Sequence, residues 1–235
     1  MICALCLSEG ELRESHIIPE FMYESLYDDI HRFHVLSDKQ RSRYAQKGLR
    51  ERLLCGRCEQ RLAVYERYVS LLMKGGIPLE YETQGRLIII RGVNYKALRM
   101  FQLSILWRAG VSTLPFFSQV SLGPHQERIR ALIITEDPGI PWQYGCFMYA
   151  LVHDGRMQED LVVQPTPSRL DDVPCYRFVF GGHVWLYFVA SHQHAKKLES
   201  ASLDPSGELR LVMKNLGDLN YIADFGRTLL EQGKL

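Results

Sequence analysis

The apolar and polar positions in the N-terminal third of the chain follow two periods in turn. Residues 11–18 alternate loosely, which predicts a short strand or hairpin arm, and residues 19–31 carry apolar side chains at helical spacing. Residues 49–54 alternate again and predict a second strand. From Gly56 the apolar positions recur at steps of three and four, which predicts an amphipathic helix that ends near residue 76. We therefore expect a first structural unit over residues 1–76.

The remaining residues, 77–235, mix the two periods. Runs rich in aromatic and β-branched residues predict strands, longer apolar runs predict helices, and Gly181-Gly182 predicts a hairpin turn. Strands grouped together with helices on either side indicate an α+β fold with a mixed antiparallel sheet. The expected strands cover residues 86–91, 145–153, 175–181, 183–190 and 208–213, and the expected helices cover residues 95–109, 124–134 and 218–231.

Composition adds little beyond a globular class. Of 235 residues, 46% are hydrophobic and 23% are charged, and the formal net charge of +1 identifies no partner. No run of about 18 apolar residues predicts a membrane span, and the first ten residues lack the pattern of a secretory signal. We expect a cytoplasmic protein with no membrane partner, in a reducing compartment where paired cysteines hold metal more often than they form disulfides. Cys146 and Cys175 stand alone in strand-like stretches and are expected to be buried core thiols.

The other four cysteines form two Cys-x-x-Cys pairs, Cys3/Cys6 and Cys55/Cys58. Four thiolates at one point bind Zn²⁺ tetrahedrally with bonds of about 2.3 Å. The second pair opens the predicted helix, and a helix N-terminus stabilises thiolates. A knuckle, a hairpin and a helix in this order are typical of a treble clef. Redox or unrelated cysteines are the alternative, and a zinc site of this kind often serves only to hold the fold.

Two short motifs accompany the cysteine pairs. Ser15-His16-Ile17-Ile18-Pro19 lies between the pairs, and the second pair stands in Leu54-Cys55-Gly56-Arg57-Cys58. Residues 3–67 thereby resemble the HNH family of ββα-metal nucleases, which place a catalytic histidine in an Asp-His-Ile-x-Pro type of motif between two such pairs. The resemblance implies that His16 is a general base that activates water. It also implies that a divalent ion stabilises the charge on the phosphate and on the leaving oxygen.

Three positions depart from the family pattern. Ser15 stands where the family usually has an acidic metal ligand, Arg50 where it has Asn, and Glu59 where it commonly has His. Carboxylate oxygens bind Mg²⁺ and Mn²⁺, so we expect Glu59 and Glu51 to supply the ligands of the catalytic ion. The alternative for each carboxylate is a solvated surface of the helix or strand.

A basic surplus lies in the same part of the chain. Residues 31–67 contain ten Lys and Arg against four Asp and Glu, and such a local face can bind phosphates even in a nearly neutral chain. We expect Glu66, about 10 Å from Glu59 along the predicted helix, to form a salt bridge with or cap residues 31–52. A solvated face is the alternative to phosphate binding. The candidate nucleic-acid contacts are Arg50, Arg52, Arg57 and Arg61.

Three hypotheses follow for the function. The first is a zinc-supported, metal-dependent endonuclease that cleaves nucleic acid, DNA in the first instance, in restriction or phage defence. The second is a zinc-containing module that binds nucleic acid or protein without cutting. The third is an assembly subunit in which zinc only folds the N-terminus. For residues 77–235 we expect binding of a protein partner, homo-oligomer formation or control of substrate access, and we expect residues 191–194 to form a surface turn.

Overall fold

The computed structural model describes residues 1–35, 43–190, 196, 198–200 and 202–233; the expected turn at 191–194 and part of the basic segment lie outside them. The N-terminal part contains a two-stranded ribbon and a long helix. β1 (Leu12–His16) pairs antiparallel with β4 (Arg50–Cys55), and α1 (Gly56–Met73) follows β4 directly. These three elements lie where the sequence predicts them. A second short ribbon, β2 (Phe33–Val35) with β3 (Arg43–Ala45), stands between β1 and β4 in the chain.

The expected helix over residues 19–31 is wrong in type and length. The segment forms only a 3₁₀ helix, η1 (Glu20–Leu26). Beyond it the Asp28 carboxylate accepts hydrogen bonds from the backbone N–H groups of Ile30, at 3.2 Å, and Arg32, at 2.7 Å. An aspartate side chain that bonds nearby backbone in this way competes with the helix and favours a turn. His31 completes the turn with a φ of 58°.

The second part of the chain builds one large mixed sheet. Its strand order is β5-β6-β12-β7-β11-β10-β9, with β8 paired to β7; β12 runs parallel to β7 and the other pairs are antiparallel. Gly181 and Gly182, with φ of 56° and 73°, form the expected hairpin turn between β10 and β11. The strands are β5 (Glu80–Gln84), β6 (Leu87–Arg91), β7 (Cys146–His153), β8 (Arg156–Met157), β9 (Val163–Leu170), β10 (Val173–Phe180), β11 (His183–Phe188) and β12 (Leu209–Asn215).

The sequence pattern misses both edges of this sheet. β9 reads VQPTPSRL, and its two prolines cannot donate ladder hydrogen bonds, so they are tolerated on an edge strand and hide the strand from a pattern search. β5 reads EYETQ and is largely exposed, as the opposite edge can be. The inner strands, whose alternation is enforced by burial, lie where they are predicted.

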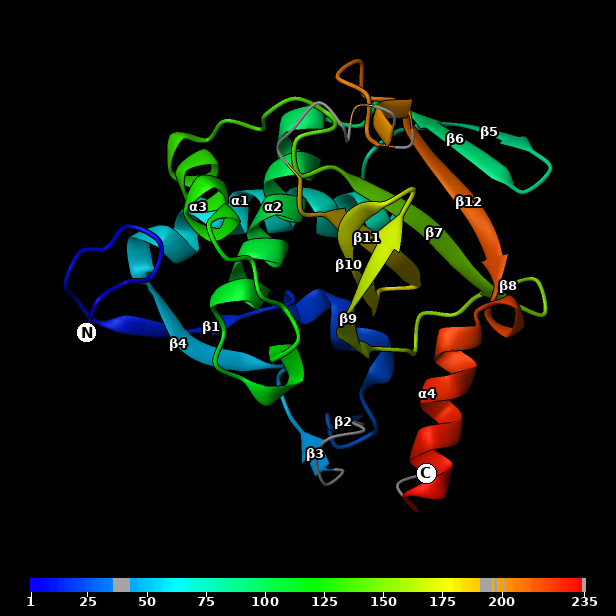
Figure 1. Cartoon of the computed structure of the whole chain (residues 1–235), viewed down its shortest axis with the longest axis horizontal. Coiled ribbons are helices and arrows are strands. Elements are labelled where there is room, and N and C mark those ends of the chain that lie inside the picture. The colour runs from blue at the N-terminus through cyan, green and yellow to red at the C-terminus, as the bar shows by residue number, and fades with distance from the viewer. Residues whose placement is uncertain (36–42, 191–195, 197, 201, 234–235) are drawn as a thin grey trace.

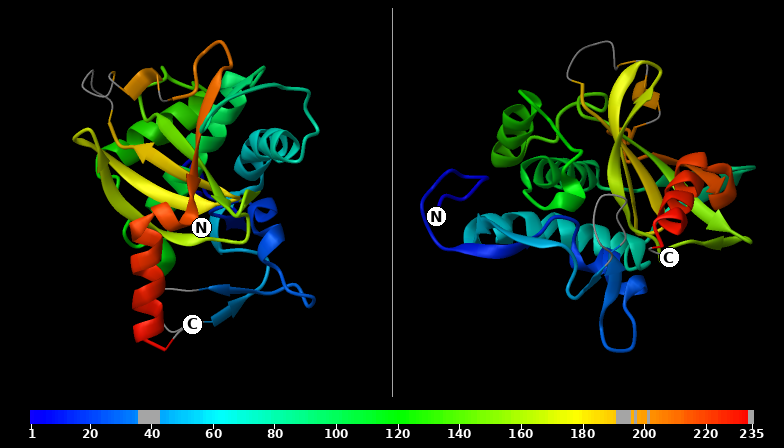
Figure 2. Two further views of the ribbon diagram at one scale, coloured as in Figure 1. Left: turned by 90° about the vertical axis from the view of Figure 1, so that its right-hand side faces the viewer. Right: turned by 60° about the horizontal axis from the view of Figure 1, so that its bottom comes forward.

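The helices cover the two faces of the sheet unequally. α1, α2 (Tyr95–Val111) and α3 (His125–Thr135) gather on one face, and α4 (Asn220–Glu231) lies on the other face and projects from the body (Figures 1 and 2). Along β11, Trp185 and Tyr187 join the core with α2, whereas Val184 and Leu186 join the core on the α4 side. Short 3₁₀ turns, η2 (Pro115–Phe117) and η4 (Leu216–Asp218), follow α2 and precede α4.

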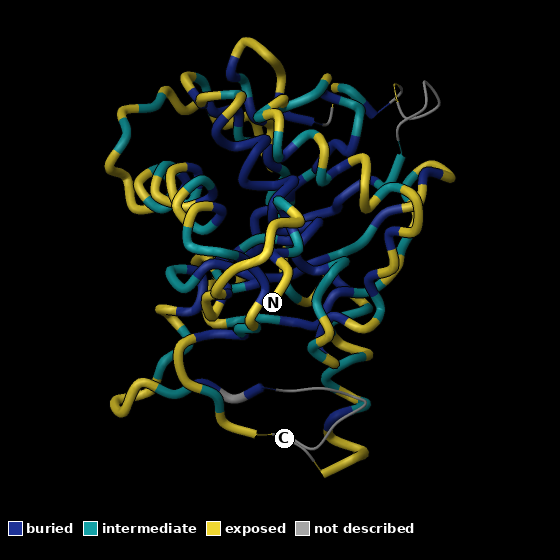
Figure 3. The backbone as a smooth tube through the Cα atoms, turned by 90° about the vertical axis from the view of Figure 1, so that its left-hand side faces the viewer, coloured by how far each residue is buried: buried dark blue, intermediate teal, exposed yellow. Residues whose placement is uncertain are grey.

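α2 is the central element of the molecule. It is buried over almost its entire length, as its continuous apolar run predicts, and it packs against both α1 and α3. Figure 3 shows the buried backbone concentrated at this centre, with exposed residues on the outer helices and loops. No helix in the described ranges is long and apolar enough to span a bilayer.

Candidate metal centre and active-site face

The two cysteine pairs meet at one point. The first pair stands in a tight turn closed by a hydrogen bond from the Cys3 amide to the Ser8 carbonyl, 3.0 Å, and the second pair lies at the start of α1. The four sulfurs all lie within 4.8 Å of one another, and the Sγ atoms of Cys6 and Cys55 are 3.8 Å apart. A tetrahedral zinc ion with bonds of about 2.3 Å requires sulfurs about 3.8 Å apart. The cluster is therefore able to hold a zinc ion, as the sequence predicts.

The surroundings of the cluster favour thiolates. Cys55 is the residue directly before α1, and its amide lies 3.3 Å from the Cys3 sulfur, so a backbone N–H group points at the site beside the positive end of the helix. A hydrogen bond from the Ser8 backbone is the main cause that lowers the pKa of Cys6, to about 6. Burial raises the pKa of Cys58, and metal binding would have to displace that proton. Cys146 and Cys175 are buried thiols elsewhere, as expected.

Three arginines lie beside the cysteines. Arg57, Arg61 and Arg130 line a pocket together with Cys6 and Cys58. A tetrathiolate zinc centre carries two negative charges, which neighbouring guanidinium groups offset. Arg61 also donates to the Ile134 carbonyl at 2.7 Å. Arg57 and Arg61, expected to contact nucleic acid, thus lie at the metal centre.

The pleat of the β1–β4 ribbon separates the candidate catalytic residues into two faces. His16 lies opposite Arg50 in the ladder, and Ser15 lies opposite Glu51. Directly paired residues project to the same side, whereas successive residues of a strand project to opposite sides. His16 and Arg50 therefore share one face, and Ser15 and Glu51 share the other.

The face that carries Ser15 is buried against the helices. The Ser15 hydroxyl donates to the Glu59 carboxylate and accepts from the Leu54 amide at 3.1 Å. The Glu51 carboxylate accepts from the Ser112 hydroxyl at 2.8 Å and from the Thr113 amide and hydroxyl at 3.0 and 2.7 Å. Contrary to expectation, neither carboxylate is brought to His16, because both bond partners on the opposite side of the ribbon.

The face that carries His16 holds a different carboxylate. The His16 Nε2 atom lies 2.9 Å from the Lys47 carbonyl and 2.7 Å from the Glu20 carboxylate. Glu20 also accepts from the Tyr27 hydroxyl at 2.5 Å and lies 3.8 Å from His31 Nε2. Burial, followed by the hydrogen bond to Glu20, raises the pKa of Tyr27. Glu20 is not among the residues predicted from the sequence, although it lies four residues after His16 and directly after Pro19.

Gly48 permits this arrangement. Its φ is 66°, in the left-handed region that favours glycine, and it lines the turn that presents the Lys47 carbonyl. A Cβ atom at this position would lie 3.0 Å from the Tyr23 ring, 3.1 Å from the Glu20 carboxylate and 3.1 Å from the His16 ring. A side chain here would therefore press directly on the imidazole and its partner.

A basic pocket opens on the same face of the ribbon. Three arginines, Arg32, Arg43 and Arg50, line it together with Tyr44 and one carboxylate, that of Glu14, which pairs with Arg52. The Arg32 guanidinium stacks over the Tyr44 ring, 4.6 Å from its centroid, and also bonds Asp28. In the part of the chain that the structure describes, Arg43 and Arg50 form no ion pair, which leaves their charges available to an anion.

The last of the predicted basic contacts, Arg52, is partly neutralised, because its Nε atom donates to Glu14 at 3.2 Å. Glu66 forms a salt bridge as expected, but its partner is Arg108 on α2 and not a residue of the 31–52 segment.

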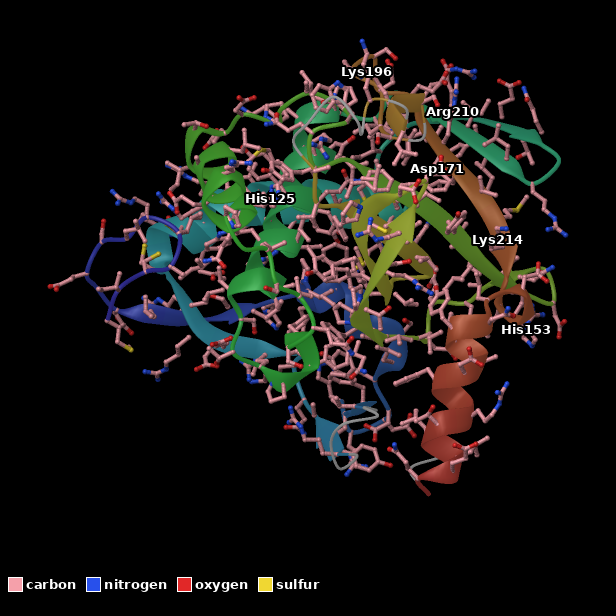
Figure 4. The ribbon with its side chains drawn as sticks, viewed as in Figure 1. His125, His153, Asp171, Lys196, Arg210 and Lys214 are labelled. Atoms are coloured by element: carbon pink, nitrogen blue, oxygen red, sulfur yellow. The ribbon has the colours of Figure 1, made fainter. Side chains whose placement is uncertain are left out.

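The labelled histidines outside this region lie well apart from each other. Figure 4 shows His125 at the start of α3 and His153 at the end of β7, near β8 and at the far end of the sheet. His125 Nδ1 lies 3.0 Å from the Tyr144 hydroxyl, and His153 is exposed beside Asp154. Within the described ranges, the four cysteines are the only group of three or more His, Cys, Asp or Glu side chains placed to hold one metal ion.

Comparison of the chain with protein families, with curated proteins and with solved structures gives no match.

Proposed function

We propose that this protein is a zinc-supported endonuclease of the HNH type, with His16 as the general base in phosphodiester hydrolysis. In this proposal the knuckle, the β1–β4 ribbon and α1 form a treble-clef, ββα-metal module. The observation that carries the proposal is the position of the His16 imidazole, fixed by Lys47 and Glu20 on the same face as an arginine-lined pocket. We place the protein in the cytoplasm, where thiolates stay reduced.

The contacts of His16 favour the tautomer of the neutral ring that is suited to a base. The Lys47 carbonyl can only accept a hydrogen bond, so the Nε2 atom that faces it carries the proton. The lone pair of the neutral ring then lies on Nδ1, which can take a proton from water. Glu20, at 2.7 Å from Nε2, stabilises the imidazolium that forms.

The resemblance also implies a divalent ion, and Glu20 is the carboxylate that the structure places beside His16; to bind an ion it would exchange its contact with Tyr27 or His16. Mg²⁺ is commonly held by one or two carboxylates together with substrate phosphates and water, so a single protein ligand is compatible with such an ion. The ion would stabilise the charge on the phosphate and on the leaving oxygen. Arg43 and Arg50 would hold the flanking phosphates, which position the nucleic acid without reading its sequence.

The test is a cleavage assay on plasmid DNA, single-stranded DNA and RNA, with Mg²⁺, with Mn²⁺ and with a chelator that leaves zinc in place. We expect cutting that His16→Ala abolishes. His153→Ala is the matched control, because that histidine is exposed and lies at the far end of the sheet. Unchanged cutting by His16→Ala would contradict the proposal. A role in restriction or phage defence then predicts that His16→Ala also removes protection in a plating assay.

The second candidate function is a module that binds nucleic acid without cutting. It is favoured by the engagement of Glu51 and Glu59 on the face opposite His16. It predicts no cleavage with any ion, and nucleic-acid affinity that falls as salt rises. Arg43→Ala and Arg50→Ala should each reduce the salt slope by about 1, whereas Arg52→Ala should reduce it less because of its pairing with Glu14. A protein partner or a second copy bound through residues 77–235 is compatible with either function.

A further inference from the structure

Arg108 is a buried cation that joins three elements. It lies in the last turn of α2 and its side chain is 1% exposed. The Nη1 atom donates to the backbone carbonyl of His16 at 2.6 Å, and Nη2 lies 2.7 Å from the Glu66 carboxylate on α1. Nε and Nη2 also donate to the carbonyl and hydroxyl of Ser104, both at 3.3 Å. The guanidinium therefore ties β1, α1 and α2 together.

Burial of this ion pair is not explained by stability. Arg108 is removed from water and Glu66 stays 24% exposed, and the cost of such burial is often only offset by the attraction of the two charges, so apolar side chains can fill such a space as well or better. What an apolar side chain cannot do is hold a carbonyl oxygen in place. The acceptor here belongs to His16, the last residue of β1. Arg108 thus acts on the backbone of the proposed general base.

Both polar groups of the peptide unit between His16 and Ile17 are hydrogen-bonded. Its carbonyl is held by Arg108, and the next amide, that of Ile17, donates to the Leu49 carbonyl at 3.1 Å. Fixing this peptide unit sets the direction in which the imidazole leaves the strand. That direction brings Nε2 to Lys47 and Glu20.

A second contact attaches α2 to the partner strand. Glu51, on β4, accepts hydrogen bonds from Ser112 and Thr113, which directly follow α2. Arg108 and Glu51 together hold the two strands of the ribbon against the same end of one helix. That helix belongs to residues 77–235, so the second part of the chain shapes the site carried by the first.

We propose that Arg108, charge-balanced by Glu66, is a positioning residue for His16. It lies on the buried side of the ribbon and has no access to substrate. The proposal deepens the proposed nuclease function and rests on it for its effect on rate. The proposal also predicts a change in the tautomer of the His16 ring, which can be measured without any cleavage.

The test compares Arg108→Lys with Arg99→Lys in the zinc-loaded full chain. Arg99 is the matched control: it lies on the same helix, is equally buried, and donates to the carbonyls of Tyr144 and Gln143 at 2.8 and 2.7 Å, away from β1. A displacement of about 1 Å at a catalytic group can cost about 10²-fold in rate. We expect Arg108→Lys to lower kcat by about that factor with little change in KM, and Arg99→Lys to leave kcat unchanged.

The second readout is the ¹⁵N chemical shifts of the His16 ring, assigned by their loss in His16→Ala. We expect one dominant tautomer in the wild type and in Arg99→Lys, and a mixed or shifted signal in Arg108→Lys. If the wild type cuts nothing, the nuclease function fails while this readout still decides the positioning role. Unchanged ring signals in a folded Arg108→Lys protein overturn the inference. If Arg108→Lys does not fold, Glu66→Gln decides in the same way, with the same ring shift expected at smaller amplitude.

Discussion

Ser15→Asp is the sharpest test of how the ribbon divides its residues between two faces. The substitution introduces, before the proposed base His16, the acidic residue that HNH nucleases usually carry before their catalytic histidine. If this position faced the active site, the change should improve metal binding and cutting. Ser15 is fully buried, however, and its hydroxyl contacts the Glu59 carboxylate and the Leu54 amide. We therefore expect a destabilised protein with no gain in activity.

The magnitude follows from charge burial. A carboxylate at this position is desolvated beside a second carboxylate, and an uncompensated buried charge costs about 3–5 kcal/mol, a large part of the about 5–15 kcal/mol that stabilises a typical domain. Ser15→Ala loses only hydrogen bonds and should cost about 1–3 kcal/mol. Adding Glu59→Gln to Ser15→Asp should recover part of the loss, because the amide removes the repulsion and can donate to the new carboxylate.

The assay is urea unfolding of the zinc-loaded protein, followed by tryptophan fluorescence, at pH 8 and at pH 5. Burial and the neighbouring carboxylate raise the pKa of the introduced carboxyl above its unfolded value. A group whose pKa is raised on folding favours the folded state least at high pH, so the deficit should be larger at pH 8 than at pH 5. Wild-type stability at pH 8, or faster cleavage by Ser15→Asp, would refute the assignment of Ser15 and Glu51 to the face opposite His16.

Two further predictions concern the metal centre and the turn beside His16. The purified chain should contain one zinc ion, measured by plasma mass spectrometry. Removal of the ion by a strong chelator, or the substitution Cys55→Ser, should unfold the N-terminal part, because structural zinc contributes about 10–16 kcal/mol of apparent binding free energy. A chelated protein whose thermal melt, followed by circular dichroism, is unchanged would contradict this prediction. Gly48→Ala should cost about 1–2 kcal/mol for the left-handed backbone alone and should lower cleavage, because the added Cβ meets His16 and Glu20 at 3.1 Å. Gly85→Ala is its control, since Gly85 has a similar φ of 59° but no atom within 4 Å of the added Cβ, and equal losses in the two variants would show that backbone strain alone accounts for the effect.

The spacing of residues along the chain predicted the elements that depend on neighbouring residues. The Cys-x-x-Cys pairs, the helix that begins at Gly56 and the inner strands of the sheet each follow from spacing, and each lies where it was expected. The prediction of a helix over residues 19–31 is wrong because the apolar spacing does not account for the hydrogen bonds that the Asp28 carboxylate accepts from nearby backbone amides. The edge strands β5 and β9 were not predicted, because a strand at the edge of a sheet needs neither full burial nor every ladder hydrogen bond.

The two carboxylates expected to bind a catalytic ion, Glu51 and Glu59, do not lie beside His16, for a different reason. Glu59 was expected from its place directly after the last cysteine and Glu51 from its place on the strand next to β1, and neither place says which side of the ribbon a side chain meets. The ladder pairing of His16 with Arg50 decides it, and a one-residue difference along a strand moves a side chain to the other face. Glu20 is only four residues from His16 in the chain, but the residues between β1 and η1 are not helical, so helical spacing does not predict their contact. Arg108 was not predictable, because its partners lie 92 and 42 positions away in the chain.

The contacts of α2 bear on whether the first 76 residues can act alone. One continuous hydrophobic core contains residues of the knuckle, of α1, of α2 and of the large sheet, from Cys3 to Leu211. Polar contacts also join residues 1–76 to residues 77–235, because Glu51 is hydrogen-bonded by Thr113 and Glu66 pairs with Arg108. Without residues 77–235, α1 would expose apolar surface that now packs on α2, and the carbonyl of His16 would lose its cationic donor. A zinc ion can hold the start of α1 to the knuckle, but it lies at the other end of the ribbon from His16. The geometry of the proposed base is therefore a property of both parts of the chain together.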